Sequence, residues 1–242
     1  MKLSRPRYNF LMTLPFDRAT HPLLEESKAE SLGKLFRLME ALENAEKKLE
    51  AVWGPELKLS IIDSRAMRAW ETQWIPYFAE HPDIADRYYG TWRDQYFVPE
   101  SLSKSYLSDN IEEFSNPAAF NVAVWHGDML CGVACGGYRG ELQRGFVSVM
   151  LREANPDPAQ PLRGKIGLII HEAAAEYARQ SDINRVCYIG PFSEGAVKVH
   201  KAMGFHRESI EFLPGMLTEA YTGYINISKP FPILTGALYP QP

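Results

Sequence analysis

The chain has 242 residues and a mass of 27.5 kDa, which is enough for one substantial domain with an extension. Its 45% hydrophobic and 23% charged residues are ordinary for a globular protein, and no run reaches the ~18 apolar residues of a membrane span. A net charge of −4 disfavours a broad nucleic-acid footprint. We therefore expect a cytoplasmic protein that binds small molecules or proteins, with no nucleic acid and no membrane as partner.

The N-terminal quarter of the chain contains one long helical pattern. Residues 1–20 are irregular, and Pro15 soon interrupts a short apolar run, so no secretory signal is expected. Residues 22–52 carry apolar side chains three and four apart, which predicts an amphipathic helix. Its stripe must be buried, either on the following domain or on a second copy of the chain. We divide the chain into an arm and long helix at 1–54 and one domain at 55–242.

The middle of the chain alternates between β-prone and helical patterns. A strand is predicted at 57–62, a helix at 65–78 and a partly helical, aromatic-rich segment at 80–118. The turn His126-Gly127-Asp128 separates two β-prone runs and predicts a hairpin. The hairpin strands are expected at 120–125 and 129–138, and a further strand at 146–151.

The second half continues the alternation. A proline-rich loop at 153–161 precedes a helix predicted at 164–180. A strand at 185–189 and a helix at 193–203 follow, and segments 212–213 and 221–227 would form a final strand pair. This order of strands and helices predicts a mixed α/β fold.

The segment from Leu162 to Gly167 carries chemical information. It places Gly164 and Gly167, with Arg163 and Lys165, at the start of a helix. Backbone N–H groups converge at a helix N-terminus, and positive side chains are unfavourable there unless an anion binds. The segment therefore predicts a phosphate site, and a solvated helix start is the alternative.

The order of elements, together with three motifs, resembles the GNAT superfamily of acyl-CoA-dependent N-acyltransferases. The motifs are this glycine turn, Ser193-Glu-Gly-Ala196 and His200-Lys-Ala-Met-Gly204-Phe205. The resemblance covers about residues 120–213, and the glycine turn is one residue shorter than the family pattern. It implies an α/β fold with a mixed, mostly antiparallel central sheet flanked by helices (GNAT-like), preceded by an N-terminal helical extension.

The resemblance also implies a reaction and a set of binding residues. An amine would attack the thioester of acetyl-CoA or another acyl-CoA directly, so the protein has to accept a proton, polarise a carbonyl and protonate a thiolate. Backbone groups of Val149, Met150 and Leu151 would hold the pantetheine arm and the carbonyl. The pyrophosphate would lie on Arg163, Gly164, Lys165, Ile166 and Gly167, and Ser193 would cap the second helix.

The catalytic candidates each have a structural alternative. His200 stands where many relatives carry a proton-donating tyrosine, and it could equally be a surface histidine. Tyr188 is a second candidate donor or a core aromatic. Glu153 is the candidate base, with Glu112, Glu113 or a water steered by Ser148 as alternatives.

No metal site is expected. His171-Glu172 lacks a second ligand four residues on, because position 175 is alanine, and the three cysteines form no ligand pair at zinc-finger spacing. We expect an N-acyltransferase that acts on the amine of a small molecule or peptide, with a possible homodimer through the N-terminal helix. The short glycine turn and the missing tyrosine motivate two alternatives, a non-catalytic acyl-CoA-binding or protein-interaction module and a transferase that uses a carrier-protein thioester.

Overall fold

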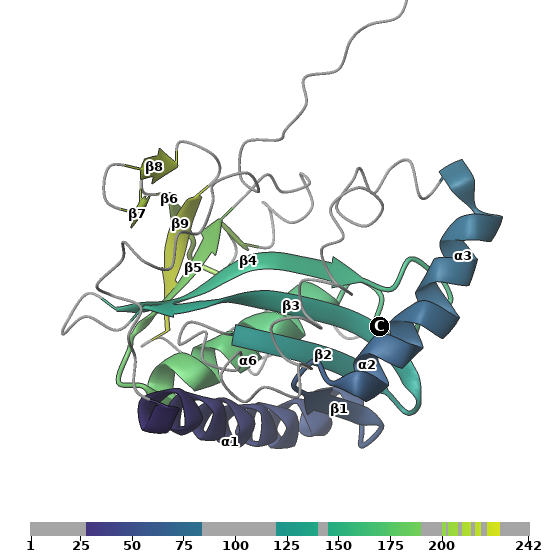
Figure 1. Cartoon of the computed structure of the whole chain (residues 1–242), viewed down its shortest axis with the longest axis horizontal. Helices are drawn as coiled ribbons and strands as arrows, with labels where there is room; N and C mark the ends of the chain where they lie inside the picture. Colours follow the sequence, from purple (N-terminus) through teal and green to yellow (C-terminus); the bar gives the residue numbers. More distant parts are fainter. Residues whose placement is uncertain are drawn as a thin grey trace, which may run out of the picture.

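A computed structural model shows that a seven-stranded sheet forms the centre of the protein (Figure 1). The structure describes residues 28–83, 120–139, 145–189, 200–201, 203–207, 210–213, 216–218 and 222–227. The sheet confirms the expected mixed, mostly antiparallel arrangement, because β4 and β5 are parallel and every other neighbouring pair is antiparallel. In spatial order its strands are β1 (Leu57–Ser60), β2 (Phe120–His126), β3 (Met129–Arg139), β4 (Phe146–Ala154), β5 (Arg185–Ile189), β9 (Thr222–Asn226) and β6 (His206–Arg207).

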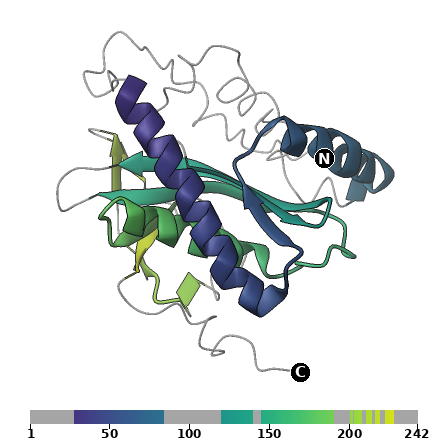
Figure 2. The same cartoon turned by 90° about the horizontal axis from the view of Figure 1, so that it is seen from below.

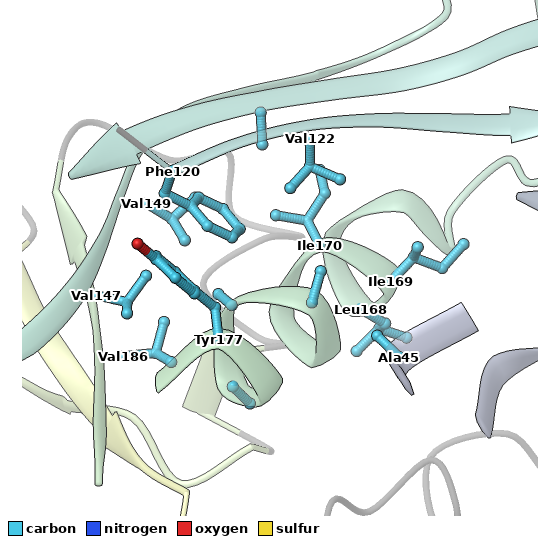
Figure 3. Close-up of a cluster of buried hydrophobic side chains, with 14 of the residues drawn as sticks. Ala45, Phe120, Val122, Val147, Val149, Leu168, Ile169, Ile170, Tyr177 and Val186 are labelled. Atoms are coloured by element: carbon cyan, nitrogen blue, oxygen red, sulfur yellow. The ribbon is translucent and has the colours of Figure 1, made fainter. Parts of the chain in front are cut away.

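Two helices cover one face of this sheet. Helix α6 (Ile166–Gln180) connects the parallel strands β4 and β5, and α1 (Lys28–Trp53) crosses it on its outer side (Figure 2). Figure 3 shows Phe120 and Val149 of the sheet facing Ile170 and Tyr177 of α6. The Phe120 and Tyr177 rings stack with their centroids 6.2 Å apart. This apolar layer is the main core of the protein.

The opposite face carries a broken helical segment over residues 64–80. It consists of α2 (Ser64–Ala69), a π-helical turn η1 (Trp70–Trp74) and α3 (Ile75–Glu80). Trp70 and Trp74 are buried in a second apolar cluster with Trp125 and Val133 of the sheet. The indole rings of Trp70 and Trp74 lie 4.7 Å apart. The predicted helix at 65–78 is thus present, but a π turn sets both indoles against the sheet.

Helix α1 packs on its own domain. Leu38, Leu42 and Leu49 are buried against α6 and β1. Phe36 and Met39 lie on the outer side, with 66% and 50% of their surface exposed. The predicted apolar stripe is therefore divided between an inner and an outer side, and coverage of the outer side by a second copy stays a prediction.

A group of charged side chains also joins α1 to α6. Lys48 of α1 bonds to Glu176 and, at 3.2 Å, to Glu172. Arg179 approaches the same carboxylates at 3.3 Å from Glu172 and 2.7 Å from Glu176. The Glu172 side chain is fully buried, so its charge depends on these two cations.

Replacing Lys48 by methionine tests this contact. Loss of one cation from a buried carboxylate is expected to lower the free energy of unfolding by about 1–2 kcal/mol. Urea denaturation of Lys48→Met measures the change. Lys47→Met is the matched control, because Lys47 pairs with Glu43 at the surface and should change stability by less than ~0.5 kcal/mol. Equal effects of both substitutions would contradict this role of Lys48.

Two sequence-based boundaries need correction. Helix α6 begins at Ile166, two residues later than predicted, because Gly164 has a φ of 76°, which a right-handed helix cannot contain. Strand β4 continues to Ala154, three residues beyond its predicted end. The hairpin of β2 and β3 and the strand β5 are confirmed.

The predicted final strand pair is wrong. Strand β7 (Ile210–Leu213) pairs with β8 (Met216–Thr218) in a separate two-stranded sheet, and β9 lies between β5 and β6. The connection between β7 and β8 is two residues long, so closing this hairpin costs little loop entropy. Strand β9 gains backbone partners on both sides by lying between β5 and β6. The arm at 1–20, most of the segment at 80–118 and most of the helix predicted at 193–203 lie outside the described residues.

No helix within the described ranges is long and apolar enough to cross a membrane.

Candidate functional site

The parallel strands β4 and β5 part in the middle of the sheet. Their ladder contains the pairs Val147–Val186, Ser148–Cys187 and Val149–Tyr188, and then it ends. Strand β4 continues for five more residues without pairing to β5. Within the described residues, β5 thus leaves the backbone edge of β4 uncovered after Val149.

A β-bulge lies at the point where the strands part. On β3, Gly136 faces Val149 and Cys135 faces Leu151, so Met150 is the extra residue of β4. The bulge shifts the alternation of side chains by one position. Val149 belongs to the core beneath α6, and after the bulge Arg152 takes that face in place of Leu151.

The loop between β4 and α6 is held by local side-chain bonds. The carboxamide oxygen of Asn155 accepts from the Asp157 amide at 3.0 Å, and the Asp157 carboxylate accepts from the Ala159 amide at 2.8 Å. These are Asx turns, which replace regular backbone pairing in a proline-rich segment. They fix the approach of the chain to Gly164.

The glycine turn then opens α6 as the sequence predicts. Arg163 is exposed and Lys165 half-buried, and the Lys165 carbonyl accepts from the Leu168 and Ile169 amides. The amides of Ile166 and Gly167 have no acceptor within the part of the chain that the structure describes. A helix start with open donors and nearby cations favours an anion.

Strand β3 approaches this helix start closely at Gly132. A Cβ atom at Gly132 would lie 2.5 Å from Cγ2 of Ile166 and 3.2 Å from the backbone oxygen of Glu153. No side chain fits this space without displacing its neighbours. The position of Ile166, and with it the helix start, therefore depends on glycine at 132.

The Leu130 carbonyl links two segments that are far apart in the sequence. It accepts from the Trp74 indole at 2.9 Å and from the Asn155 carboxamide at 2.8 Å. Trp74 belongs to the π turn and Asn155 opens the loop before α6. One backbone atom of β3 thus holds both segments.

A buried polar group lies next to Gly167. Nη1 of Arg152 is 2.7 Å from Nε2 of His200, which is fully buried. The His200 ring lies 4.2 Å from the Tyr188 ring, and the Tyr188 hydroxyl bonds to Nδ1 of His171. Strands β4 and β5, helix α6 and the chain at 200 each supply one member. We call Arg152, His200, Tyr188 and His171 the polar cluster.

Burial and the Arg152 charge set the protonation of this cluster. Burial, followed by the nearby Arg152 and His171, lowers the pKa of His200 to about 2. Burial, followed by Arg179 and Arg152, lowers the pKa of His171 to about 3. Burial also raises the pKa of the Tyr188 phenol. All three rings are therefore neutral at physiological pH, and His200 is not the surface histidine of the alternative reading.

The other candidate residues are not all close together. Glu153 faces Val133 across the ladder, and Val133 packs with the indoles of α2 and η1. Glu153 is therefore on the sheet face opposite to the polar cluster. Ser148 is buried within β4. Glu112, Glu113 and Ser193 lie outside the described residues.

Two members of the polar cluster escaped the sequence interpretation. Arg152 lies in a strand next to Glu153, and the pattern of residues gives no sign of the bulge that turns it toward α6. His171 drew attention only as a metal ligand, although it bonds to Tyr188. Among the described residues, no three His, Cys, Asp or Glu side chains are grouped so that they could hold a metal ion.

By sequence, the chain matches no family profile and no curated protein. It is similar in structure to ribosomal-protein-S5-alanine acetyltransferase from Vibrio fischeri, with 16% identity, 73% of this chain and 97% of that chain covered, and a TM-score of 0.46. It is also similar to the PaiA N-acetyltransferase of Thermoplasma acidophilum in complex with coenzyme A, with 11% identity, 70% and 98% coverage and a TM-score of 0.46. A third similar structure is Mycobacterium smegmatis RimJ in complex with CoA-disulfide, with 12% identity, 69% and 78% coverage and a TM-score of 0.44.

At such identities these likenesses concern the course of the chain, and the chemistry has to be argued from its own residues. The structure confirms the predicted mixed α/β arrangement, in which helices flank a mostly antiparallel sheet. Two features of this topology bear on the site: the parallel strands part at a bulge, and a helix that follows a glycine turn connects them.

Proposed function

We propose that the protein is an N-acyltransferase that moves an acyl group, most simply acetyl, from acyl-CoA to the amine of a small molecule or peptide. The observation that carries this proposal is the parting of β4 and β5 at the Met150 bulge, directly beside the start of α6. An extended thioester arm fits a free strand edge, and a diphosphate fits the helix start. Both halves of an acyl-CoA molecule therefore have a complementary surface.

The donor would bind along β4 and the glycine turn. Backbone groups of Val149, Met150 and Leu151 hold the pantetheine arm and the thioester carbonyl in this proposal. The amides of Ile166 and Gly167, with Arg163, Gly164 and Lys165, hold the diphosphate. Open amides and the turn at Gly164 support this assignment.

The reaction needs no covalent enzyme intermediate. The amine nitrogen attacks the carbonyl carbon, a C–N bond forms, and the C–S bond breaks as the oxyanion collapses. The amine loses one proton and the leaving thiolate gains one. Tyr188 keeps its phenolic proton and is a candidate donor, with His200 as the other. Glu153, or a water steered from β4, is the candidate base.

A second proposal follows from the state of His200. Nε2 of His200 is bonded to Arg152, and this chain lacks the proton-donating tyrosine that the resemblance leads us to expect at position 200. A GNAT-like module that binds acyl-CoA or a protein without catalysis would keep the donor site and lack turnover. A carrier-protein thioester as donor is the further alternative, in which the diphosphate site matters less.

Isothermal titration with acetyl-CoA and free coenzyme A tests the donor site. Micromolar binding is expected for the wild type, with a loss of at least about tenfold in Arg163→Glu, because a carboxylate then opposes the diphosphate. Arg68→Glu is the matched control, because Arg68 is exposed on α2 on the other sheet face. It should bind like the wild type.

The outcomes separate the proposals. Binding with turnover in an amine-acceptor screen supports the transferase. Binding without turnover of any amine favours the non-catalytic module. A wild type that binds neither ligand rules out an acyl-CoA donor and leaves the carrier-protein thioester or a module that binds a protein.

A further inference from the structure

We propose that Arg152 contacts the diphosphate of the acyl-CoA donor and that His200 positions Arg152 instead of protonating the leaving sulfur. The inference rests on the proposed function and gives one of its residues a different role. It also adds to the site a residue that sequence patterns do not identify.

The backbone brings Arg152 to the donor side. Without a bulge, alternation along β4 would place Leu151 on the face of Val147 and Val149. The extra residue Met150 moves Arg152 onto that face. The guanidinium reaches Gly167, where a Cβ atom would lie 3.4 Å from Nη1. Arg152 thus lies over the first turn of α6.

The hydrogen bond between Arg152 and His200 has a defined direction. Arginine has only donors, so Nε2 of His200 accepts and the ring proton is on Nδ1. Nε2 therefore carries no proton that it could give to a thiolate. Neutrality of the imidazole fits this direction, because burial and the adjacent Arg152 lower the pKa of His200.

Aromatic packing fixes the acceptor. The fully buried His200 ring lies between Tyr188, at 4.2 Å, and Phe205, at 5.8 Å between centroids. Tyr188 is itself held by His171. The Arg152 guanidinium carbon also lies 5.5 Å from the Tyr188 ring centroid, within cation–π range. The guanidinium is therefore held by a rigid ring and a rigid acceptor.

The chemistry of the ligand follows from this placement. A guanidinium presents five N–H donors in a planar fork, and Nε2 of His200 accepts from Nη1 of Arg152. The Arg152 guanidinium lies over the first turn of α6, and Arg163 and Lys165 directly precede that helix in the sequence. This concentration of positive charge is complementary to a multiply charged oxyanion. In acyl-CoA that group is the diphosphate, whereas the pantetheine arm has no charge. The proton for the sulfur then comes from Tyr188 or from water.

Titration with coenzyme A and with pantetheine, which lacks the diphosphate, tests the inference. Arg152→Met is expected to weaken coenzyme A binding by roughly tenfold or more and to change pantetheine binding by less than about twofold. His200→Ala should weaken coenzyme A binding in the same direction. His200→Gln should restore most of it, because the glutamine oxygen can accept from Arg152 but cannot act as an acid. Arg68→Met is the control for loss of a positive charge elsewhere.

Kinetics distinguish positioning from acid catalysis. If His200 positions Arg152, His200→Ala raises KM for acetyl-CoA, His200→Gln restores it, and the pH profile of kcat keeps its shape. If His200 is the acid, both variants lower kcat and leave coenzyme A affinity unchanged, which overturns the inference. Should His200→Ala fail to fold, the test relies on Arg152→Met alone. Equal losses of affinity for coenzyme A and for pantetheine in that variant refute the inference. A wild type that binds no coenzyme A refutes the proposed function as well.

Discussion

Lowering the pH from 7.5 to 5 is expected to remove about 4 kcal/mol from the free energy of unfolding. Burial lowers the pKa of His200 to about 2 and that of His171 to about 3, so both stay neutral in the native state. In the unfolded chain each takes up a proton below about pH 6.5. The unfolded state then binds more protons, so this loss is negligible at about pH 7.5 and grows as the pH falls through 6.5 toward 3. Each histidine contributes about 2 kcal/mol at pH 5.

Urea denaturation between pH 7.5 and 5 measures this dependence. The wild type should lose about 2.7 kcal/mol per pH unit near pH 5, and His200→Gln about half of that, because one titrating group is gone. A slope that His200→Gln leaves unchanged would contradict a buried, neutral His200.

Gly132→Ala is expected to lower the free energy of unfolding by about 2–3 kcal/mol and to weaken coenzyme A binding. The new methyl group would lie 2.5 Å from Cγ2 of Ile166, an atom bonded to a β-branched carbon with little rotamer freedom. The methyl group would also lie 3.2 Å from the backbone oxygen of Glu153. The helix start must therefore move, and the open amides at 166 and 167 move with it.

A double-mutant cycle identifies the cause. Ile166→Ala removes the clashing atoms, so adding Gly132→Ala to it should cost much less than adding it to the wild type. Gly33→Ala is the control, because among the described residues a Cβ there comes no closer than 3.6 Å to the Arg37 guanidinium, and alanine favours a helix. Additive effects of the two substitutions in the cycle would show that the contact with Ile166 is not the source of the loss.

Local patterns in the sequence predict much of the fold. The turn at Gly127 between two β-prone runs predicts the β2–β3 hairpin, and the glycine turn predicts the start of α6 to within two residues. Such features depend on neighbouring residues alone. The pairing of β9 with β5 and β6 does not depend on neighbouring residues, because it joins strands that are distant in the sequence.

The candidate site shows the same limit. Gly164 and Gly167 can be recognised in the sequence, because glycine at a helix start lets the backbone turn and approach an anion closely. Arg152 depends on a single extra residue at Met150, and alternation without a bulge selects Leu151 in its place. The contact of Lys48 with Glu172 joins residues 124 positions apart, so no local pattern reveals that α1 is held on α6.

The shared carbonyl of Leu130 limits how this scaffold can be modified. Trp74 of the π turn and Asn155 of the loop before α6 donate to the same oxygen. A graft that exchanges residues 64–80 for a helix from another protein therefore also alters the anchor of the loop leading to Gly164. Engineers who redesign the helices should carry Trp74, Leu130 and Asn155 over as one unit.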